Sequence, residues 1–229
     1  MKESPEQCVQ QIDINPKKSH RRLIQVRDFA TDFYHQRFLQ DKDALDYQTK
    51  TRGHSLESLK NFRVGLAGGD LIGAASGNGY TIDDLIQTGL VRKFKNSYSA
   101  TIPAGMNVYP HIINQDVAYW SIKDRTGKWK HQVKKQFADP DWICLNQNSL
   151  DYSPVVIVEG ENDLLAIVDK GKHPNTIATI GNFNTRNILA HIEQNSKDKT
   201  FYLIFDRDDA GKKYTKKYAK TIKAGGGLV

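Results

Sequence analysis

Three acidic residues stand at the ends of apolar runs near the C-terminus, where carboxylates could bind a metal ion. Glu159 follows the run 155–158, and Asp206 and Asp208 follow the run 201–205. If both runs are strands of one parallel sheet, their carboxyl ends share the edge where open α/β folds bind ligands. Carboxylates brought together there repel one another unless a cation neutralises them. Oxygen donors of this kind suit Mg²⁺ or Mn²⁺, and the chemistry that they suggest is phosphoryl transfer.

The residues next to these acids are small or acidic. Gly160 follows the glutamate and Gly211 follows the aspartates, so a phosphate could approach the next helix N-terminus at either place. Asp163 taken alone suits an ordinary acidic residue in the first turn of a helix. The aspartate pair taken alone would also suit a solvated turn with a helix cap. Glu161 and Asp209 are expected to be accessory charges.

The C-terminal third alternates apolar runs with helical segments. This order predicts a right-handed parallel α/β unit over 151–229, with a domain boundary near 149–154. One more strand would be expected after residue 229, so we expect the sequence to be a fragment of a longer protein. The expected strands are 155–158, 176–180 and 201–205, and the expected helices are 162–169, 185–194 and 210–223.

The region before residue 150 has mixed periodicity. Three- and four-residue spacing of apolar residues predicts a helix over 22–47, and Ser55 is expected to cap a second, short helix. Three β-type runs separated by turn residues predict antiparallel strands. We therefore expect an α+β subdomain over 23–150 after a tail at 1–22. A further helix is expected at 82–89, and the three strands at 107–113, 117–123 and 129–134.

The C-terminal third resembles a Toprim domain. An apolar strand that ends in Glu-Gly with an aspartate four residues after the glutamate is one family signature, and an apolar strand that ends in Asp-x-Asp before Ala-Gly is the other. Ala178-Thr-Ile-Gly181 matches the family's middle strand. The two signatures read Val155-Val-Ile-Val-Glu-Gly-Glu-Asn-Asp-Leu-Leu-Ala166 and Leu203-Ile-Phe-Asp-Arg-Asp-Asp-Ala-Gly211.

The region before it resembles the start of the catalytic core in bacterial DnaG-type primases. In that family an aromatic-rich helix leads to an Arg-Gly element, a Phe-x-Ile-Gly element and a hairpin. The stretches that carry the resemblance are Phe29-Ala-Thr-Asp-Phe-Tyr34, Ala44-Leu-Asp-Tyr47, Thr51-Arg-Gly53, Leu59-Lys-Asn-Phe-Arg-Val-Gly65, Met106-Asn-Val-Tyr-Pro110 and Ile122-Lys-Asp-Arg-Thr-Gly127.

The resemblance implies a DNA-directed RNA polymerase that joins ribonucleoside triphosphates into short primers on a single-stranded DNA template. It implies Glu159, Asp206 and Asp208 as catalytic residues, and these three with Asp163 as ligands of Mg²⁺ or Mn²⁺. A Toprim nuclease, which shares the acids but adds water instead of a hydroxyl group, is the alternative. A non-catalytic replication module is a third possibility, although such a module would be expected to lose the acids.

Two features usual in primases are missing from this sequence. The two cysteines, Cys8 and Cys144, cannot form the zinc-binding domain that usually precedes the core, so no zinc is expected in this chain. No Gly-x-x-x-x-Gly-Lys-[Ser/Thr] loop occurs, so a partner helicase would lie elsewhere, separate or fused. A further acidic element of the family would fall beyond Val229.

Charge and composition point to a nucleic-acid partner. The net charge of +7 favours a polyanion, and 38% hydrophobic residues indicate an ordinary folded chain. No apolar stretch approaches a membrane span and residues 1–16 lack the apolar core of a signal peptide, so we expect a cytoplasmic protein without a membrane partner. The other lysines of 210–223 are expected to form a solvated face. Nucleotide or DNA contacts are expected from Lys123, Lys128, Lys134, Lys135 and Lys212, with a solvated surface as the alternative for each.

Overall fold

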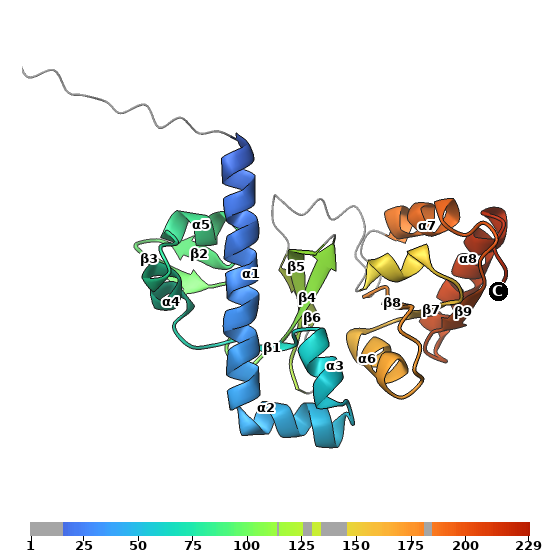
Figure 1. The fold of residues 1–229 in the computed structure, drawn as a ribbon, viewed down its shortest axis with the longest axis horizontal. Coiled ribbons are helices and arrows are strands. Elements are labelled where there is room, and N and C mark those ends of the chain that lie inside the picture. The colour runs from blue at the N-terminus through green and yellow to red at the C-terminus, as the bar shows by residue number, and fades with distance from the viewer. Residues whose placement is uncertain (1–15, 114, 126–129, 134–145, 181–184) are drawn as a thin grey trace, which may run out of the picture.

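The computed structural model describes residues 16–113, 115–125, 130–133, 146–180 and 185–229. An N-terminal part built around a long helix and an antiparallel sheet lies beside a C-terminal part built on a parallel sheet (Figure 1). This mixture of helices and strands confirms the expected α/β class. None of the described helices is both long enough and apolar enough to cross a membrane.

The N-terminal part packs its longest helix, α1, against the sheet β1-β4-β5-β6. Trp120 is fully buried there and its Nε1 donates a hydrogen bond to Thr31 Oγ1 at 2.9 Å. The three antiparallel strands expected from the sequence are confirmed. The elements are α1 (Pro16–Gln40), α2 (Lys42–Asp46), a π-helical turn (Tyr47–Thr51), α3 (Leu56–Asn61), β1 (Gly65–Leu66), α4 (Leu71–Gly77), α5 (Ile82–Gln87), β2 (Val91–Phe94), β3 (Ser97–Ala100), β4 (Asn107–Ile113), β5 (Asp116–Lys123) and β6 (Lys130–Val133).

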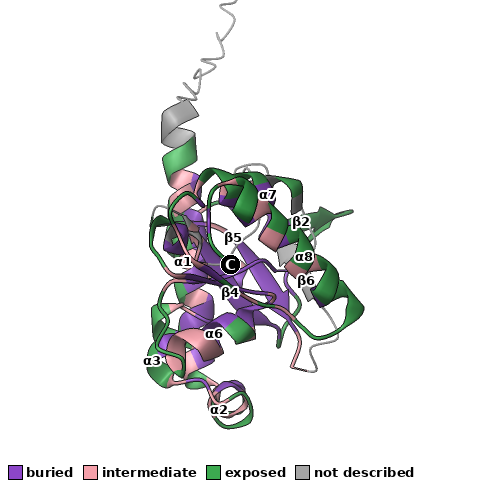
Figure 2. Ribbon diagram, turned by 90° about the vertical axis from the view of Figure 1, so that its right-hand side faces the viewer, coloured by how far each residue is buried: buried purple, intermediate pink, exposed green. Residues whose placement is uncertain are grey.

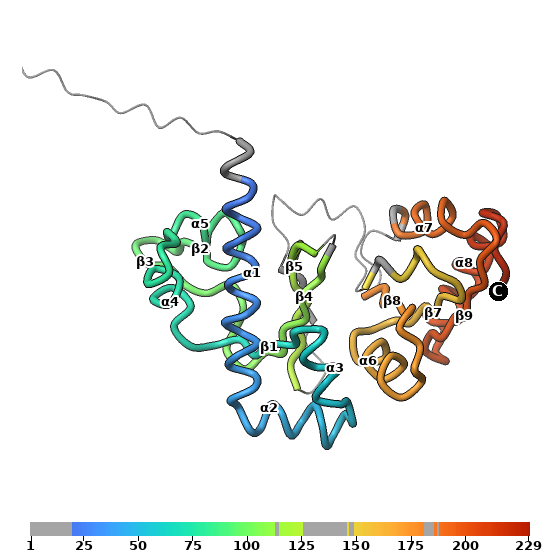
Figure 3. Tube along the Cα trace, in the orientation of Figure 1, coloured from blue at the N-terminus to red at the C-terminus, as the bar shows by residue number. Residues whose placement is uncertain are grey.

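Two features of this part differ from the expectation. The single helix expected over 22–47 is broken at Asp41, whose side chain accepts a hydrogen bond from Ala44 N at 2.8 Å and so caps α2. The chain turns sharply at this point (Figure 3). Helix α4 and the β2–β3 hairpin were not expected, because the glycine-rich segment around them carries no long periodic pattern. Ser55 caps α3 as expected.

The C-terminal part is a three-stranded parallel sheet of order β8-β7-β9 with helices on both faces. Helices α7 and α8 pack on the face that carries Val155, Ile157 and Phe201. Helix α6 packs on the opposite face, against Val156 and Val158. The expected order of strands and helices is confirmed. The elements are a 3-10 turn (Gln147–Asp151), β7 (Val155–Val158), α6 (Glu161–Asp169), β8 (Thr176–Ala178), α7 (Thr185–Gln194), β9 (Phe201–Ile204) and α8 (Asp209–Ala224).

One hydrophobic cluster joins the two parts. From the N-terminal part it includes Phe38, Leu59 and Tyr109, and from the C-terminal part it includes Leu164 and Leu165 of α6. Helices α3 and α6 lie side by side at this junction (Figure 1). Apolar surface shared in this way ties the stability of each part to the presence of the other.

Substituting Leu164 in this cluster should therefore destabilise both parts. The side chain is fully buried, and a Leu164→Ala change should cost about 2–5 kcal/mol of unfolding free energy through reduced burial and the cavity left behind. Trp120 is buried in the N-terminal part, so its fluorescence follows that part once Trp129 and Trp142 are replaced by phenylalanine. If the two parts are coupled, the denaturant midpoint measured by fluorescence and the one measured by circular dichroism should fall equally. An unchanged midpoint by fluorescence would contradict the coupling.

Candidate active site at the carboxyl ends of the parallel strands

Glu159 lies directly after the central strand of the parallel sheet. All four residues of β7 are buried, and the half-buried Glu159 follows them at the strand's carboxyl end. Its backbone carbonyl accepts a hydrogen bond from Ile180 N at 2.9 Å, which continues the ladder between β7 and β8 by one residue. Gly160 then begins the turn into α6. The position of this carboxylate is thus set by the central strand of the sheet, all of which is buried.

Asp206 and Asp208 follow the neighbouring strand. Val158 pairs with Ile204 in parallel register, so the two aspartates lie just beyond the residue level with Glu159. Both are exposed, and Asp208 Oδ1 accepts a hydrogen bond from Gly211 N at 2.7 Å, which caps α8. A Cβ atom at Gly211 would lie 1.9 Å from the backbone oxygen of Asp206. A glycine is required there, because any side chain would push the helix away from the aspartates.

These acids share a sheet edge without forming a preassembled cluster. Within the described residues, no group of three or more His, Cys, Asp or Glu side chains is close enough to hold a metal ion. Carboxylate oxygens at the end of a parallel sheet have the donor chemistry that hard divalent cations prefer. The residues therefore fit such an ion by type and by edge, and the side chains would have to gather around it.

A buried ion pair lies next to the turn that carries Glu159. Lys123 Nζ, at the end of β5, is 2.5 Å from Glu161 Oε2, in the first turn of α6, and both side chains are almost fully buried. Burial by itself would raise the pKa of Glu161, but the Lys123 ammonium holds that pKa below its usual range, with help from the Ser121 hydroxyl. A Cβ atom at Gly160 would lie 3.2 Å from Lys123 Nζ, so the glycine lets the ammonium sit against the turn.

A hydrogen-bonded chain extends this junction. Gln48 Nε2 donates to Tyr109 Oη at 3.0 Å, and Tyr109 Oη donates to Asn162 Oδ1 at 3.1 Å. Burial raises the pKa of Tyr109 far above its ordinary value, so the phenol stays protonated and can donate. At the far end of α6, Asp169 accepts a hydrogen bond from the backbone N–H of Ser55. Helix α6 is therefore held by the N-terminal part at both of its ends.

The remaining residues expected to act at the site have mixed placements. Asp163 is exposed and its Oδ2 accepts a hydrogen bond from Gly160 N at 3.1 Å, a helix-capping contact. The Lys123 ammonium, expected to contact DNA, is occupied by Glu161 in this structure. Lys212 is exposed and pairs with Asp209 at 3.4 Å. The other expected contacts, Lys128, Lys134 and Lys135, lie outside the described residues.

Sequence reasoning missed the role of Glu161. We expected an accessory charge, whereas the side chain is 2% exposed and paired with Lys123. No local pattern reveals this role, because the burial of the run Ser121-Ile-Lys123 is apparent only in the folded chain. A buried lysine requires a buried partner, and the acid that follows Gly160 is available for that purpose.

Part of the chain matches a family model, and most of it aligns with a curated relative. Residues 156–228 match the Toprim-like family. The DNA primase of Helicobacter pylori is 24% identical over 205 residues, which cover 84% of this chain and 36% of the relative. The chain thus spans about a third of the length of this relative.

Solved structures share the fold across both parts of the chain. The Aquifex aeolicus primase, which comprises zinc-binding and RNA polymerase domains, superposes with a TM-score of 0.78 at 19% identity over 91% of this chain and 54% of that one. The chain has the fold of a DnaG primase core. A DnaG primase catalytic domain bound to single-stranded DNA gives a TM-score of 0.70 at 20% identity, over 90% of this chain and 67% of that one. The DnaG-type fold thus includes both the antiparallel sheet and the Toprim-like part.

The Lys123–Glu161 pair predicts a strong thermodynamic coupling. Either Lys123→Met or Glu161→Gln should lower the unfolding free energy by about 3–5 kcal/mol, because each leaves one buried charge without its partner. The double variant should cost much less than the sum of the single variants, as measured by denaturant unfolding. Costs that simply add would contradict the pairing.

Proposed function

We propose that this chain is the catalytic core of a DNA primase, which joins ribonucleoside triphosphates into short RNA primers on a single-stranded DNA template. The observation that carries the proposal is the alignment of both parts of the chain with one primase fold over 91% of its length. A Toprim-like part alone would suit several reactions, and it is the antiparallel part beside it that favours a primase.

The acids at the sheet edge would carry the reaction. Glu159, Asp206 and Asp208 would hold Mg²⁺ or Mn²⁺, with Asp163 as a further ligand. A bound divalent ion would neutralise charge on the incoming triphosphate. Glu159 would act as a ligand or as the base toward the attacking primer hydroxyl. The strand-end position of the acids and the glycine at 211, which keeps α8 close to Asp206, support these roles.

The template and the other partners follow from charge and from the relatives. A DnaG catalytic domain binds single-stranded DNA, and the net charge of +7 suits the same ligand here. Lys128, Lys134, Lys135 and Lys212 would contact the template or the nucleotide. We place the protein in the cytoplasm with a replicative helicase, separate or fused, as its partner.

A divalent ion should bind at the sheet edge. Isothermal titration with Mn²⁺ should detect binding that weakens in Asp206→Asn and in Asp208→Asn, because each change removes a charged oxygen donor. Asp209→Asn is the matched control, since this exposed acid forms an ion pair with Lys212 and should leave the affinity unchanged. If all three variants and the unaltered chain bind Mn²⁺ with equal affinity, the proposed metal site is wrong.

Glu159→Gln should abolish primer synthesis while preserving the fold. With a single-stranded template, labelled ribonucleotides and Mg²⁺ or Mn²⁺, the rate should fall on the order of 10²–10⁴-fold, the contribution of a positioned acid or base. Asp198→Asn is the control, because this exposed acid precedes β9 at its opposite end and has a φ of 59°, which asparagine tolerates.

Initiation and extension of a supplied primer should be assayed side by side. Template-dependent oligomers in either format, absent with Glu159→Gln, are the expected result. Metal-dependent shortening of the DNA without any synthesis, abolished in the same variant, would replace the primase with a Toprim nuclease.

A further inference from the structure

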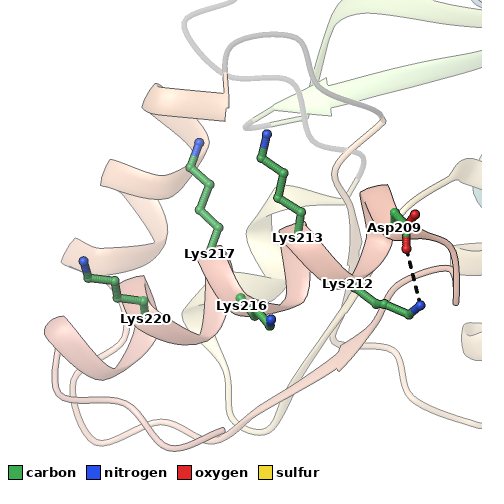
Figure 4. Close-up of a pocket in the computed structure, with 6 residues that line it drawn as sticks. All are labelled: Asp209, Lys212, Lys213, Lys216, Lys217 and Lys220. Carbon is green, nitrogen blue, oxygen red and sulfur yellow. Dashed lines mark hydrogen bonds and ion pairs between the residues drawn. The ribbon is translucent and has the colours of Figure 1, made fainter.

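The outer face of α8 is a ridge of lysines. Six lysines and one aspartate lie on this sixteen-residue helix, in a chain whose net charge is +7. Much of the side of α8 seen in Figure 2 is exposed. Side chains of this helix line a shallow surface hollow of about 600 Å³ (Figure 4). We call Lys212, Lys213, Lys216, Lys217, Lys220 and Lys223 the α8 ridge; the hollow is lined by the first five of these lysines and Asp209.

The ridge concentrates like charges instead of mixing them. Lys212 and Lys216, Lys213 and Lys217, and Lys216 and Lys220 are each four residues apart, a spacing at which like charges destabilise a helix. Asp209 is the one acid in the sequence of α8, and it meets Lys212 at 3.4 Å. A surface that served only solubility would intersperse both signs. The ridge therefore carries a repulsion that an anionic partner would relieve.

The ridge is held in place from beneath. Tyr218 and Ile222 of α8 are buried against the parallel sheet, which fixes the rotation of the helix and points the lysines outward. Lys213 and Lys217 extend to the same side of the helix (Figure 4). From residue 212 to residue 220 the helix advances about 12 Å, a length over which one strand of a duplex presents about three phosphates.

We infer that the α8 ridge binds the phosphodiester backbone of a nucleic acid without reading its bases. The structure describes every residue of α8 and exposes no large apolar side chain on it, so the ridge lacks the residues that insertion into a lipid surface would use. This fully described helix also lacks exposed aromatic rings on which bases could stack, which leaves phosphates as the matching groups. The helix begins beside Asp208, so a strand held on the ridge would lie next to the carboxylate edge.

Binding to labelled DNA tests the ridge directly. Fluorescence anisotropy with single-stranded and duplex oligonucleotides of several sequences should show weaker binding by Lys213→Gln/Lys217→Gln than by the unaltered chain. The slope of log affinity against log salt should flatten by about one unit for each phosphate that the variant no longer neutralises, equally across sequences. Lys213→Arg/Lys217→Arg keeps the charges and should restore both values. Comparing single-stranded with duplex DNA shows which backbone the ridge prefers. Weaker binding of either kind of DNA by the glutamine variant supports the inference.

The matched control is Lys42→Gln/Lys60→Gln, which removes the same net charge from exposed positions on α2 and α3. An equal drop of affinity in this control would mean that overall charge is responsible, and would overturn the ridge. An unchanged affinity and slope in Lys213→Gln/Lys217→Gln would overturn it too. The inference does not rest on primer synthesis, because an intact ridge would bind DNA even in a chain that makes no primers.

Discussion

The packing of α6 on two sides is the constraint on which the rest of the structure depends. One side of this helix covers the parallel sheet, and its buried leucines also belong to a core shared with α1, α3 and β4. Polar contacts from the N-terminal part hold its first turn through Lys123 and Tyr109, and its last turn through Ser55. Because Glu159 precedes α6 by a single glycine, its position reflects both parts of the chain.

The ion pair in this junction matters more for geometry than for net stability. Removing two charges from water costs several kcal/mol for each ion, and the attraction between them offsets this desolvation cost only with good geometry and further hydrogen bonds. The N-terminus of α6 also offsets part of the cost for Glu161, because the helix dipole favours a negative charge there. Two leucines in place of Lys123 and Glu161 could pack as tightly, but they would allow β5 and α6 to shift relative to each other. A pair with a 2.5 Å separation fixes the register between β5 and α6.

The sequence was most informative where the local pattern of apolar residues is strong. The run 155–158 and the segment 185–194 became a strand and a helix with the expected bounds, because a fully buried strand and an amphipathic helix leave distinct local patterns. The break at Asp41 was missed because apolar spacing continues across it into Leu45. The Lys123–Glu161 pair was missed because the two residues meet only after folding. The shared edge of the acids followed from topology, whereas the separation of their side chains depends on rotamers, which no local pattern specifies.

The order of the parallel sheet gives the acids supports of unequal stiffness. Strand β7 is hydrogen bonded on both sides, and Glu159 extends directly from it. Strand β9 has β7 on one side and, among the described residues, only the contact with Leu228 on the other. Asp206 and Asp208 then lie on an exposed turn beyond that outer strand. Backbone amides of β7 should accordingly exchange with solvent more slowly than those of β9. If the three carboxylates bind a cation, Glu159 should stay in place while Asp206 and Asp208 move toward it. The aspartates would then lose more conformational freedom than the glutamate.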